Sequence, residues 1–152
     1  MFIVSCRSDS GNYSCLAENA HGLGMSNNIS VMVEFVPTCL SSEAQMISVS
    51  VHESVDLECA MTSRPQNVSF TWKIFPRDTG GGEVEVASSQ FTQHSTRSVL
   101  TFTPRTPADF GKLECSGANK LGPGKPCIFQ INRKVKPLCS SVQRSLQRKD
   151  LI

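Results

Sequence analysis

The sequence predicts an all-β protein of two-sheet sandwich domains, and the main observation is a motif that occurs twice. The motif D-x-G-x-Y/L-x-C-x-x-x-N runs from Asp9 to Asn19 and again from Asp109 to Asn119. Asp-x-Gly closes a corner before a strand, and the residue two before the cysteine shares its inward face because side chains alternate along a strand. The copies lie 100 residues apart, about one sandwich domain, which predicts an array of domains.

The spacing of cysteine and tryptophan around the second copy supports the same fold. Cys59 precedes Trp72 by 13 residues and Cys115 by 56. In an immunoglobulin-like β-sandwich such residues lie on strands B, C and F, where a disulfide joins the sheets and the indole packs on it. We therefore expect one complete immunoglobulin-like β-sandwich, preceded by the C-terminal strands of another.

Residues 1–36 are predicted to be the C-terminal part of a truncated domain. Residues 12–19 form strand F, residues 25–35 form strand G, and the glycines between His21 and Gly24 make the hairpin. Only a scrap of strand E, at residues 2–6, precedes them. Two complete strands cannot build a core alone. Val36-Pro37-Thr38 is expected to be a short, stiff linker.

Residues 37–132 are predicted to be the complete domain, because apolar residues alternate along each expected strand. A turn at 78–82 leads into a short strand at 83–87, and a turn at 121–124 leads into strand G at 126–131. Residues 133–152 lack alternation and are expected to be a linker or disordered tail. The expected inward positions are Val55, Leu57, Cys59 and Met61 on strand B, Val68, Phe70, Trp72 and Ile74 on strand C, and Leu100 and Phe102 on strand E.

Seven cysteines in a β-rich chain predict an oxidising compartment, and their odd number leaves at least one without a partner in the chain. Cys59 is expected to pair with Cys115 across the core beside Trp72. By loop entropy a bridge of this separation stabilises the fold by about 4 kcal/mol. Cys39, expected to open strand A, and Cys127 would clamp strand A to strand G. The alternative for that pair is two free thiols.

The partners of Cys6, Cys15 and Cys139 stay open. Cys15 lacks a strand-B cysteine, and Cys139 is assigned to a module beyond the chain. Three N-x-S sequons, at Asn12, Asn28 and Asn67, are predicted glycosylation sites and agree with an extracellular location.

The start of the chain lacks the features of a signal peptide, and no stretch approaches the ~18 apolar residues of a membrane span. An extracellular domain without a leader leads us to expect a fragment of a longer protein or an artefact of gene prediction.

Charge and motifs exclude several classes of function. From Arg133 onward there are six bases and one acid, so residues 1–132 hold nine bases and twelve acids and are mildly acidic. That balance gives no reason to expect nucleic acid or phospholipid as a partner. The three histidines lack metal-ligand spacing, and no nucleophile–base pair, phosphate loop or dinucleotide fingerprint is present. We expect no enzyme, metal, cofactor or small-molecule substrate. Arg97 is a candidate ion-pair partner of Asp109, with a structural role.

The second domain resembles the sidestep family of invertebrate cell-surface proteins. The resemblance covers about residues 9–131 and is most specific over strands E to G. It rests on the S-V-L-T-F-T-P run ending at Pro104, the D-F-G corner at Asp109, N-K-L-G from Asn119, P-C-I-F from Pro126, the segment from Glu18 to Asn27 and the V-P-T-C run ending at Cys39.

This resemblance implies a single-pass neuronal surface protein that acts in adhesion and axon guidance through partners of the beaten-path family. It implies a plasma-membrane location with these domains outside the cell. It also implies that the complete domain precedes a fibronectin type III domain, whose start would be the run from Lys136 to Cys139. The competing hypothesis is a structural module of an extracellular-matrix or muscle array of immunoglobulin domains.

Overall fold

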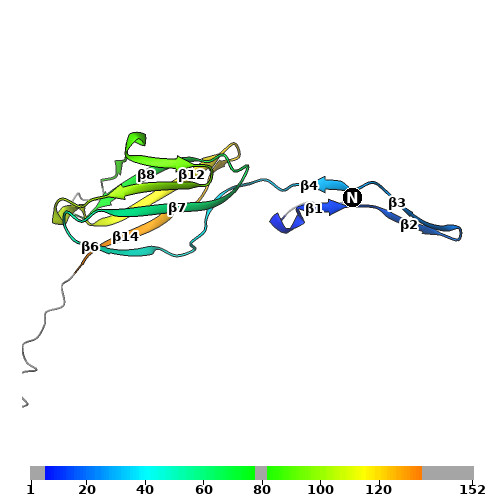
Figure 1. The fold of residues 1–152 in the computed structure, drawn as a ribbon, viewed down its shortest axis with the longest axis horizontal. Helices are drawn as coiled ribbons and strands as arrows, with labels where there is room; N and C mark the ends of the chain where they lie inside the picture. Colours follow the sequence, from blue (N-terminus) through cyan, green and yellow to red (C-terminus); the bar gives the residue numbers. More distant parts are fainter. Residues whose placement is uncertain (1–5, 78–81, 135–152) are drawn as a thin grey trace, which may run out of the picture.

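The computed structural model describes residues 6–77 and 82–134. Two β-sheets pack face to face to form a sandwich (Figure 1). The first sheet has the order β10 (Phe91–His94), β11 (Arg97–Phe102), β7 (Val55–Arg64) and β5 (Phe35–Cys39), all antiparallel. The second has the order β6 (Gln45–Val49), β14 (Cys127–Arg133), β12 (Gly111–Asn119), β8 (Ser69–Pro76) and β9 (Val84–Glu85), with β13 (Gly122–Pro123) on the end of β12. Among the strands of the described residues, only β6 and β14 pair in parallel.

The core lies between the sheets and follows the alternation of the strands. Along β7, β8, β11 and β12 the buried residues fall at every second position, and those at the strand ends are partly exposed. Of the expected inward positions, Val55 and Ile74 are only half-buried and pack at the margin. The largest fully buried side chains are Trp72, Phe129, Leu57, Leu113 and Ile131. Short 3-10 turns, η2 (Ser88–Gln90) and η3 (Pro107–Asp109), connect the strands.

The expected linker is part of the sandwich, so the prediction of a linker at Val36-Pro37-Thr38 was wrong. These residues belong to β5, and Pro37 is fully buried. Proline is tolerated because β5 is an edge strand, and the pairing with β7 shifts register between Phe35 and Thr38. Cys39 ends β5 instead of opening it. The chain then crosses to the other sheet, where β6 pairs with β14.

Residues 6–34 form a segment that projects from one end of the sandwich (Figure 1). After η1 (Arg7–Asp9), β1 (Gly11–Tyr13) pairs with β4 (Ile29–Val31), and β2 (Leu16–Asn19) pairs with β3 (Gly22–Met25). The two long strands expected here are therefore broken. At the break the Cys15 amide donates to Ser26 Oγ at 2.8 Å, so a hydroxyl takes the place of a ladder carbonyl.

Three sequence expectations fall wholly or mainly outside the described residues. They are the scrap of strand E at 2–6, the turn at 78–82 and the tail after residue 134, which includes Cys139. In the part of the chain that the structure describes, no helix is long and apolar enough to cross a membrane.

Candidate functional site

Two disulfides join the sheets side by side. Cys59–Cys115 connects β7 to β12 with Cα atoms 6.3 Å apart, and Cys39–Cys127 connects β5 to β14 with Cα atoms 5.5 Å apart. Cys115 and Cys127 are direct cross-strand neighbours, so both bridges leave the second sheet at the same level. Cys59 and Cys115 are fully buried, which shields their bridge from redox reagents, whereas Cys39 of the second bridge is half-buried and Cys127 is 2% exposed. This arrangement suits a structural role.

Trp72 packs in the centre of the same core, and its one polar atom is satisfied. Its Nε1 donates to Ser98 Oγ at 3.0 Å, and that hydroxyl donates to the Thr92 carbonyl at 2.9 Å. The indole lies 5.4 Å from the ring of Phe129 and is fully buried. A buried indole that is both packed and hydrogen-bonded connects the sheets without leaving an unpaired donor.

The projecting segment repeats the strand pairing of the sandwich at an offset of 100 residues. In β1 and β4, Asn12 pairs with Ser30; in β12 and β14, Lys112 pairs with Gln130. Tyr13 likewise pairs with Ile29 as Leu113 pairs with Phe129, and Asn19 pairs with Gly22 as Asn119 pairs with Gly122. The segment therefore has the strand arrangement of the β12–β14 region, without the sheet that covers that region in the sandwich.

The hairpin tips match as well. Gly22 and Gly122 both have positive φ, at 138° and 130°, a region that favours glycine. Asn19 Oδ1 accepts the amide of His21 at 2.8 Å, and Asn119 Oδ1 accepts the amide of Leu121 at 2.9 Å. Each asparagine at the end of the motif therefore closes the turn that follows its strand.

The corner before each copy is held by the motif aspartate. The Asp109 carboxylate accepts the amides of Thr106 and Arg105 at 2.8 and 2.7 Å. The hydrogen bond from Thr106, with a further contribution from Arg105, holds the pKa of Asp109 below its ordinary value, although partial burial opposes this shift. In the first copy Asp9 accepts the amide of Cys6 at 2.8 Å.

The expected ion pair between Arg97 and Asp109 is wrong. Arg97 instead pairs with Glu58 on the outer face of the first sheet. Arg97 stands opposite Ala60 on β7, at the far end of β11 from the corner, so its side chain reaches the diagonal neighbour Glu58. The Asp109 carboxylate accepts hydrogen bonds from backbone amides instead of from the guanidinium of Arg97.

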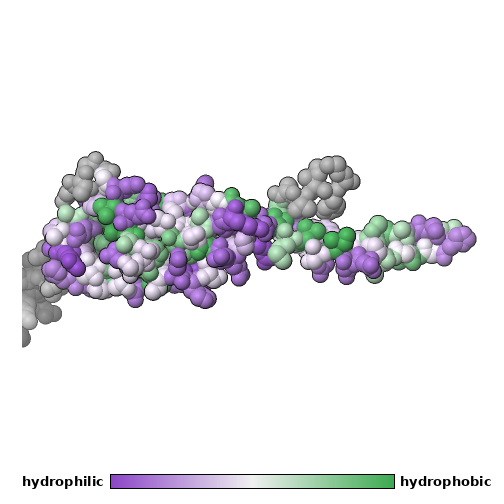
Figure 2. Space-filling view, turned by 90° about the horizontal axis from the view of Figure 1, so that it is seen from above, coloured by the Kyte–Doolittle hydropathy of each residue, from purple (hydrophilic) through white to green (hydrophobic). Residues whose placement is uncertain are grey.

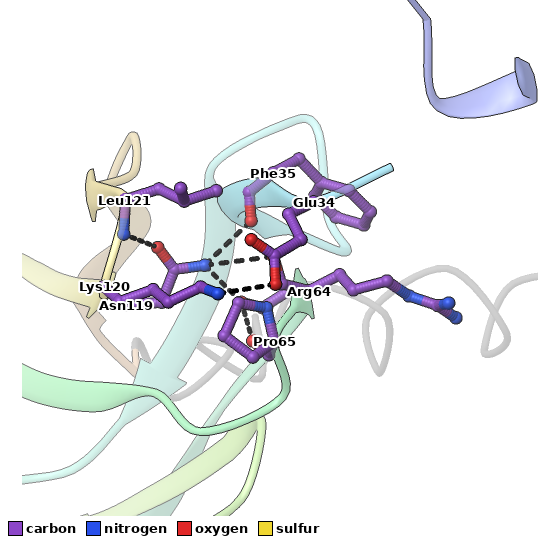
Figure 3. A network of polar contacts seen from close by, with 8 residues as sticks. Glu34, Phe35, Arg64, Pro65, Asn119, Lys120 and Leu121 are labelled. Atoms are coloured by element: carbon purple, nitrogen blue, oxygen red, sulfur yellow. Dashed lines mark hydrogen bonds and ion pairs between the residues drawn. The ribbon is translucent and has the colours of Figure 1, made fainter. Parts of the chain in front are cut away.

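The projecting segment is anchored to the sandwich by a polar network at the tip of the β12–β13 turn (Figure 3). Asn119 Nδ2 donates to the Phe35 carbonyl at 2.8 Å and to Ser63 Oγ at 3.1 Å. Lys120 Nζ lies 2.7 Å from Glu34 Oε1. The same asparagine that closes its own turn therefore also binds the strand that leads in from the segment.

A second contact from the segment reaches the start of β5. The Arg7 guanidinium lies 3.8 Å from the centroid of the Phe35 ring, and its Nη2 donates to Thr38 Oγ1 at 2.6 Å. Both sides of Phe35 are therefore held, the backbone by Asn119 and the ring by Arg7.

Two glycines let this junction close. A Cβ on Gly124 would overlap the carbonyl of Pro37, and one on Gly117 would lie 2.6 Å from Met61 Sδ. The equivalent Gly24 in the segment has only one atom near such a Cβ, the Ala17 oxygen at 3.9 Å. Gly124 is thus required by the close approach of β5, and Gly117 mainly by the core side chains of Met61 and Val68.

Sequence reasoning missed this junction. Its partners lie far apart in the sequence, for example 84 residues between Asn119 and Phe35. The one available signal was the asparagine that ends both copies of the motif. An asparagine at this position predicts a turn, but it does not predict which distant residue the side chain will hydrogen-bond.

The two outer faces of the sandwich differ in chemistry. On β7 and β11 the outer groups pair with one another, as in Thr101 with Asp56 at 2.7 Å. On β8, β12 and β14 the outer groups include Ile128, which is 36% exposed, and Phe75 beneath the ammonium of Lys112 at 4.2 Å. The second face therefore offers apolar area and charge together.

Apolar side chains are also exposed along the projecting segment (Figure 2). Leu16, Leu23, Met25 and Ile29 are 62–73% exposed. Cys15, also exposed, forms no disulfide within the described residues. The counterpart of Cys15 in the sandwich is Cys115, which is bonded and buried.

The sequon asparagines Asn12, Asn28 and Asn67 are all exposed. Asn12 lies on β1, Asn28 precedes β4, and Asn67 lies in the loop before β8. In residues 6–77 and 82–134 no group of His, Cys, Asp and Glu is arranged to hold a metal ion.

Comparison with known sequences identifies adhesion proteins. Lachesin of Schistocerca americana is 28% identical over 137 residues, which cover 88% of this chain and 37% of the relative. Protein amalgam of Drosophila melanogaster is 32% identical over 116 residues, which cover 76% of this chain and 34% of the relative. The chain thus spans about a third of the length of these relatives. No family model matches the chain.

Solved structures identify the fold. A three-domain fragment of titin superposes with a TM-score of 0.54 at 23% identity, covering 86% of this chain and 44% of the fragment. Hemolin, an insect immune protein, superposes with a TM-score of 0.53 at 18% identity, covering 86% of this chain and 30% of hemolin. The chain contains an immunoglobulin-like β-sandwich, and its relatives are cell-adhesion proteins of the immunoglobulin superfamily, which are not enzymes.

Proposed function

We propose that this chain is part of an extracellular receptor for adhesion or guidance, and that it acts by protein–protein recognition. The observation that carries the proposal is the repeat: the segment of residues 6–34 shares strand pairing with β12–β14 and leads directly into β5, and Asn119 and Lys120 hold the connection. Two disulfides and three exposed sequons support a place outside the cell. The similarity to Lachesin extends across 88% of the chain and so includes the junction.

We further propose the division of the chain into residues 1–36, 37–132 and 133–152, as the C-terminal part of one immunoglobulin domain, a complete domain and a tail. The sidestep-type motifs support a receptor of that family, located at the plasma membrane, with a beaten-path-type protein as its partner. Cys59, Cys115, Cys39 and Cys127 would form its disulfides and Trp72 its central packing residue.

The outer face of β8, β12 and β14 is the surface through which we propose that the sandwich contacts a partner. Ile128 and the Phe75–Lys112 pair combine apolar area with a charge that is not buried, as the centres and rims of interfaces do. The face on β7 and β11 is occupied by its own polar pairs.

The test is a binding screen with the full chain, produced behind a secretion signal and multimerised so that weak contacts are detected through avidity. The multimerised chain is tested for binding to a set of immunoglobulin-superfamily ectodomains, which includes a beaten-path-type ectodomain, and to extracellular-matrix preparations. We expect saturable binding to an immunoglobulin-superfamily ectodomain. Binding to the beaten-path type supports the finer assignment, and binding only to matrix supports the competing hypothesis of a matrix array.

Matched variants locate the contact. Ile128→Asp, on the proposed face, is expected to weaken binding at least tenfold, the effect of losing about 1.4 kcal/mol. Thr92→Asp, on the outer face of the first sheet, is expected to bind as the wild type does. Equal loss in both variants, or in neither, would place the contact elsewhere.

A further inference from the structure

The ribbon formed by β1 and β4 has two chemically different faces. Tyr13 stands opposite Ile29, and Gly11 stands opposite Val31, so these residues share one face. Asn12 stands opposite Ser30 on the other face, because side chains alternate along each strand. One face is therefore apolar and the other carries an amide and a hydroxyl.

Two glycosylation sequons converge on the polar face. Asn12 heads the sequon that ends at Ser14, and Ser30 ends the sequon headed by Asn28. Asn12, Asn28 and both serines are exposed. The ladder thus places two sequons that are 16 residues apart in the sequence diagonally across one two-stranded ribbon.

The acceptor amides are unengaged, whereas another asparagine of the segment has a structural bond. Asn19 accepts the amide of His21, which closes the hairpin. In the described part of the chain, the side-chain amides of Asn12 and Asn28 make no hydrogen bond that would hold them to the protein. They have no structural role that a sugar would disrupt.

The repeat shows which face of a complete domain this is. Asn12 corresponds to Lys112, on the outer face of β12, whereas Tyr13 corresponds to Leu113, which is fully buried. The polar face of the ribbon is therefore the solvent side of the domain, and its apolar face is the side that packs.

We propose that Asn12 and Asn28 both carry N-linked oligosaccharides, so that the outer face of the first domain's strands F and G is covered by sugar. This inference rests on the extracellular location proposed above. In the reaction, Nδ2 of the asparagine bonds to the anomeric carbon of a lipid-linked oligosaccharide. The bond from that carbon to the donor's pyrophosphate breaks, and the amide gives up one proton. The equivalent face of the second domain, around Lys112 and Ile128, has no sequon and stays bare.

The sequence allows both sites to be read from one peptide. Trypsin cuts after Arg7, does not cut before Pro65, and next cuts after Lys73, so all three sequons lie on residues 8–73. The full chain is expressed behind a secretion signal in insect cells and reduced. The whole membrane-associated and secreted pool is digested, so that the result does not depend on folding or secretion. Release of the sugars in heavy-oxygen water converts each occupied asparagine to labelled aspartate.

We expect labelled aspartate at positions 12 and 28 of the same peptide molecules. Ser14→Ala should remove only the label at Asn12, and Ser30→Ala only the label at Asn28. Ser69→Ala, which removes the sequon of Asn67 on the sandwich, should leave both unchanged. Peptides labelled at one of the two positions or at neither would overturn the proposal. A doubly labelled chain that binds no ectodomain would instead count against the proposed function alone.

Discussion

Trp72 is the residue on which the packing of the sandwich most depends. Its ring packs against Phe129 of β14 in the same sheet, and its Nε1 donates to Ser98 on the opposite sheet. Packing and hydrogen bonding thus converge on one side chain that is fully buried. Substitutions at this position separate the two contributions.

Trp72→Ala is expected to lower the free energy of unfolding by about 3–5 kcal/mol, because it leaves a large cavity in a close-packed core. Trp72→Phe keeps much of the ring but leaves Ser98 without its donor, and is expected to cost less. Denaturant melts of the full chain measure both. A loss below about 1 kcal/mol for Trp72→Ala, against a typical cavity cost of several kcal/mol, would contradict the central role of the indole.

Asp109 is expected to make stability depend on pH. Its pKa is lower in the folded protein than its ordinary value of 3.8, so its stabilisation is present above that value. The stabilisation is lost as the pH falls through the lower, folded pKa. Asp109→Ala should cost about 1 kcal/mol at pH 7, as loss of a helix cap does, and the difference from wild type should shrink below about pH 4.

Urea melts from pH 2 to pH 8 measure this difference. Glu43→Ala, which changes an exposed carboxylate, serves as the control and should differ little from wild type throughout. A cost of Asp109→Ala that is independent of pH would mean that the ionised carboxylate is not what holds the corner.

The β12–β14 region and β5 form the element-scale contact that connects the two units. Gly124 lets Pro37 of β5 approach the hairpin, and Asn119 donates to the Phe35 carbonyl. The repeat supplies an internal control, because a Cβ on the equivalent Gly24 would have only the Ala17 oxygen nearby, at 3.9 Å.

Gly124→Ala is expected to destabilise the sandwich by about 1–3 kcal/mol, the usual cost of forcing a methyl group into a packed site. Gly24→Ala, at the equivalent position of the segment, should cost much less because its Cβ would meet only one atom, at 3.9 Å. Thermal melts compare the two variants. Equal effects would show that β5 does not pack against the hairpin in solution.

The two bridges are an element-scale prediction for the secreted protein. Non-reducing peptide mapping should recover Cys59 with Cys115 and Cys39 with Cys127, as their positions in facing strands require. Removing the second bridge by Cys39→Ala with Cys127→Ala should cost about 2–5 kcal/mol. Recovery of Cys39 with Cys139, or of Cys127 as a free thiol, would contradict the second pair.

At the scale of the whole molecule, the described residues form a sandwich of two facing sheets and a projecting segment of two short ladders. The sandwich buries its apolar residues between two sheets, whereas the segment exposes Leu23, Met25 and Ile29 on short ladders. Two ladders of this length hold little buried area, so their stability in isolation is low. Exposed apolar strands without a partner also favour aggregation.

Residues 37–132 alone are therefore expected to be more soluble than residues 1–132, and the segment should exchange its amide hydrogens quickly. Hydrogen-exchange mass spectrometry of both lengths, with light scattering, measures this. The β7, β8 and β12 amides should be protected in both and serve as the internal reference. Strong protection across residues 12–33 would show that the segment folds as an independent unit.

Much of the sandwich was determined by the sequence itself. Alternation along β7, β8, β11 and β12, together with the spacing of Cys59, Trp72 and Cys115, predicts strands and an inward face because the side-chain period of a strand is two. The repeated motif likewise predicts both corners and both hairpins, since Asp, Asn and Gly meet local demands of the backbone.

Only the tertiary structure decided how β5 and β6 divide between the sheets, why Pro37 belongs to a strand, and what Asn119 and Arg97 bind. These outcomes depend on which groups meet across the fold. The pattern of neighbouring residues in the sequence does not predict a hydrogen-bond partner 84 residues away, such as Phe35 for Asn119. At the break between β1 and β2, the Cys15 amide donates to Ser26 Oγ, a local competition that the alternation of side chains does not predict.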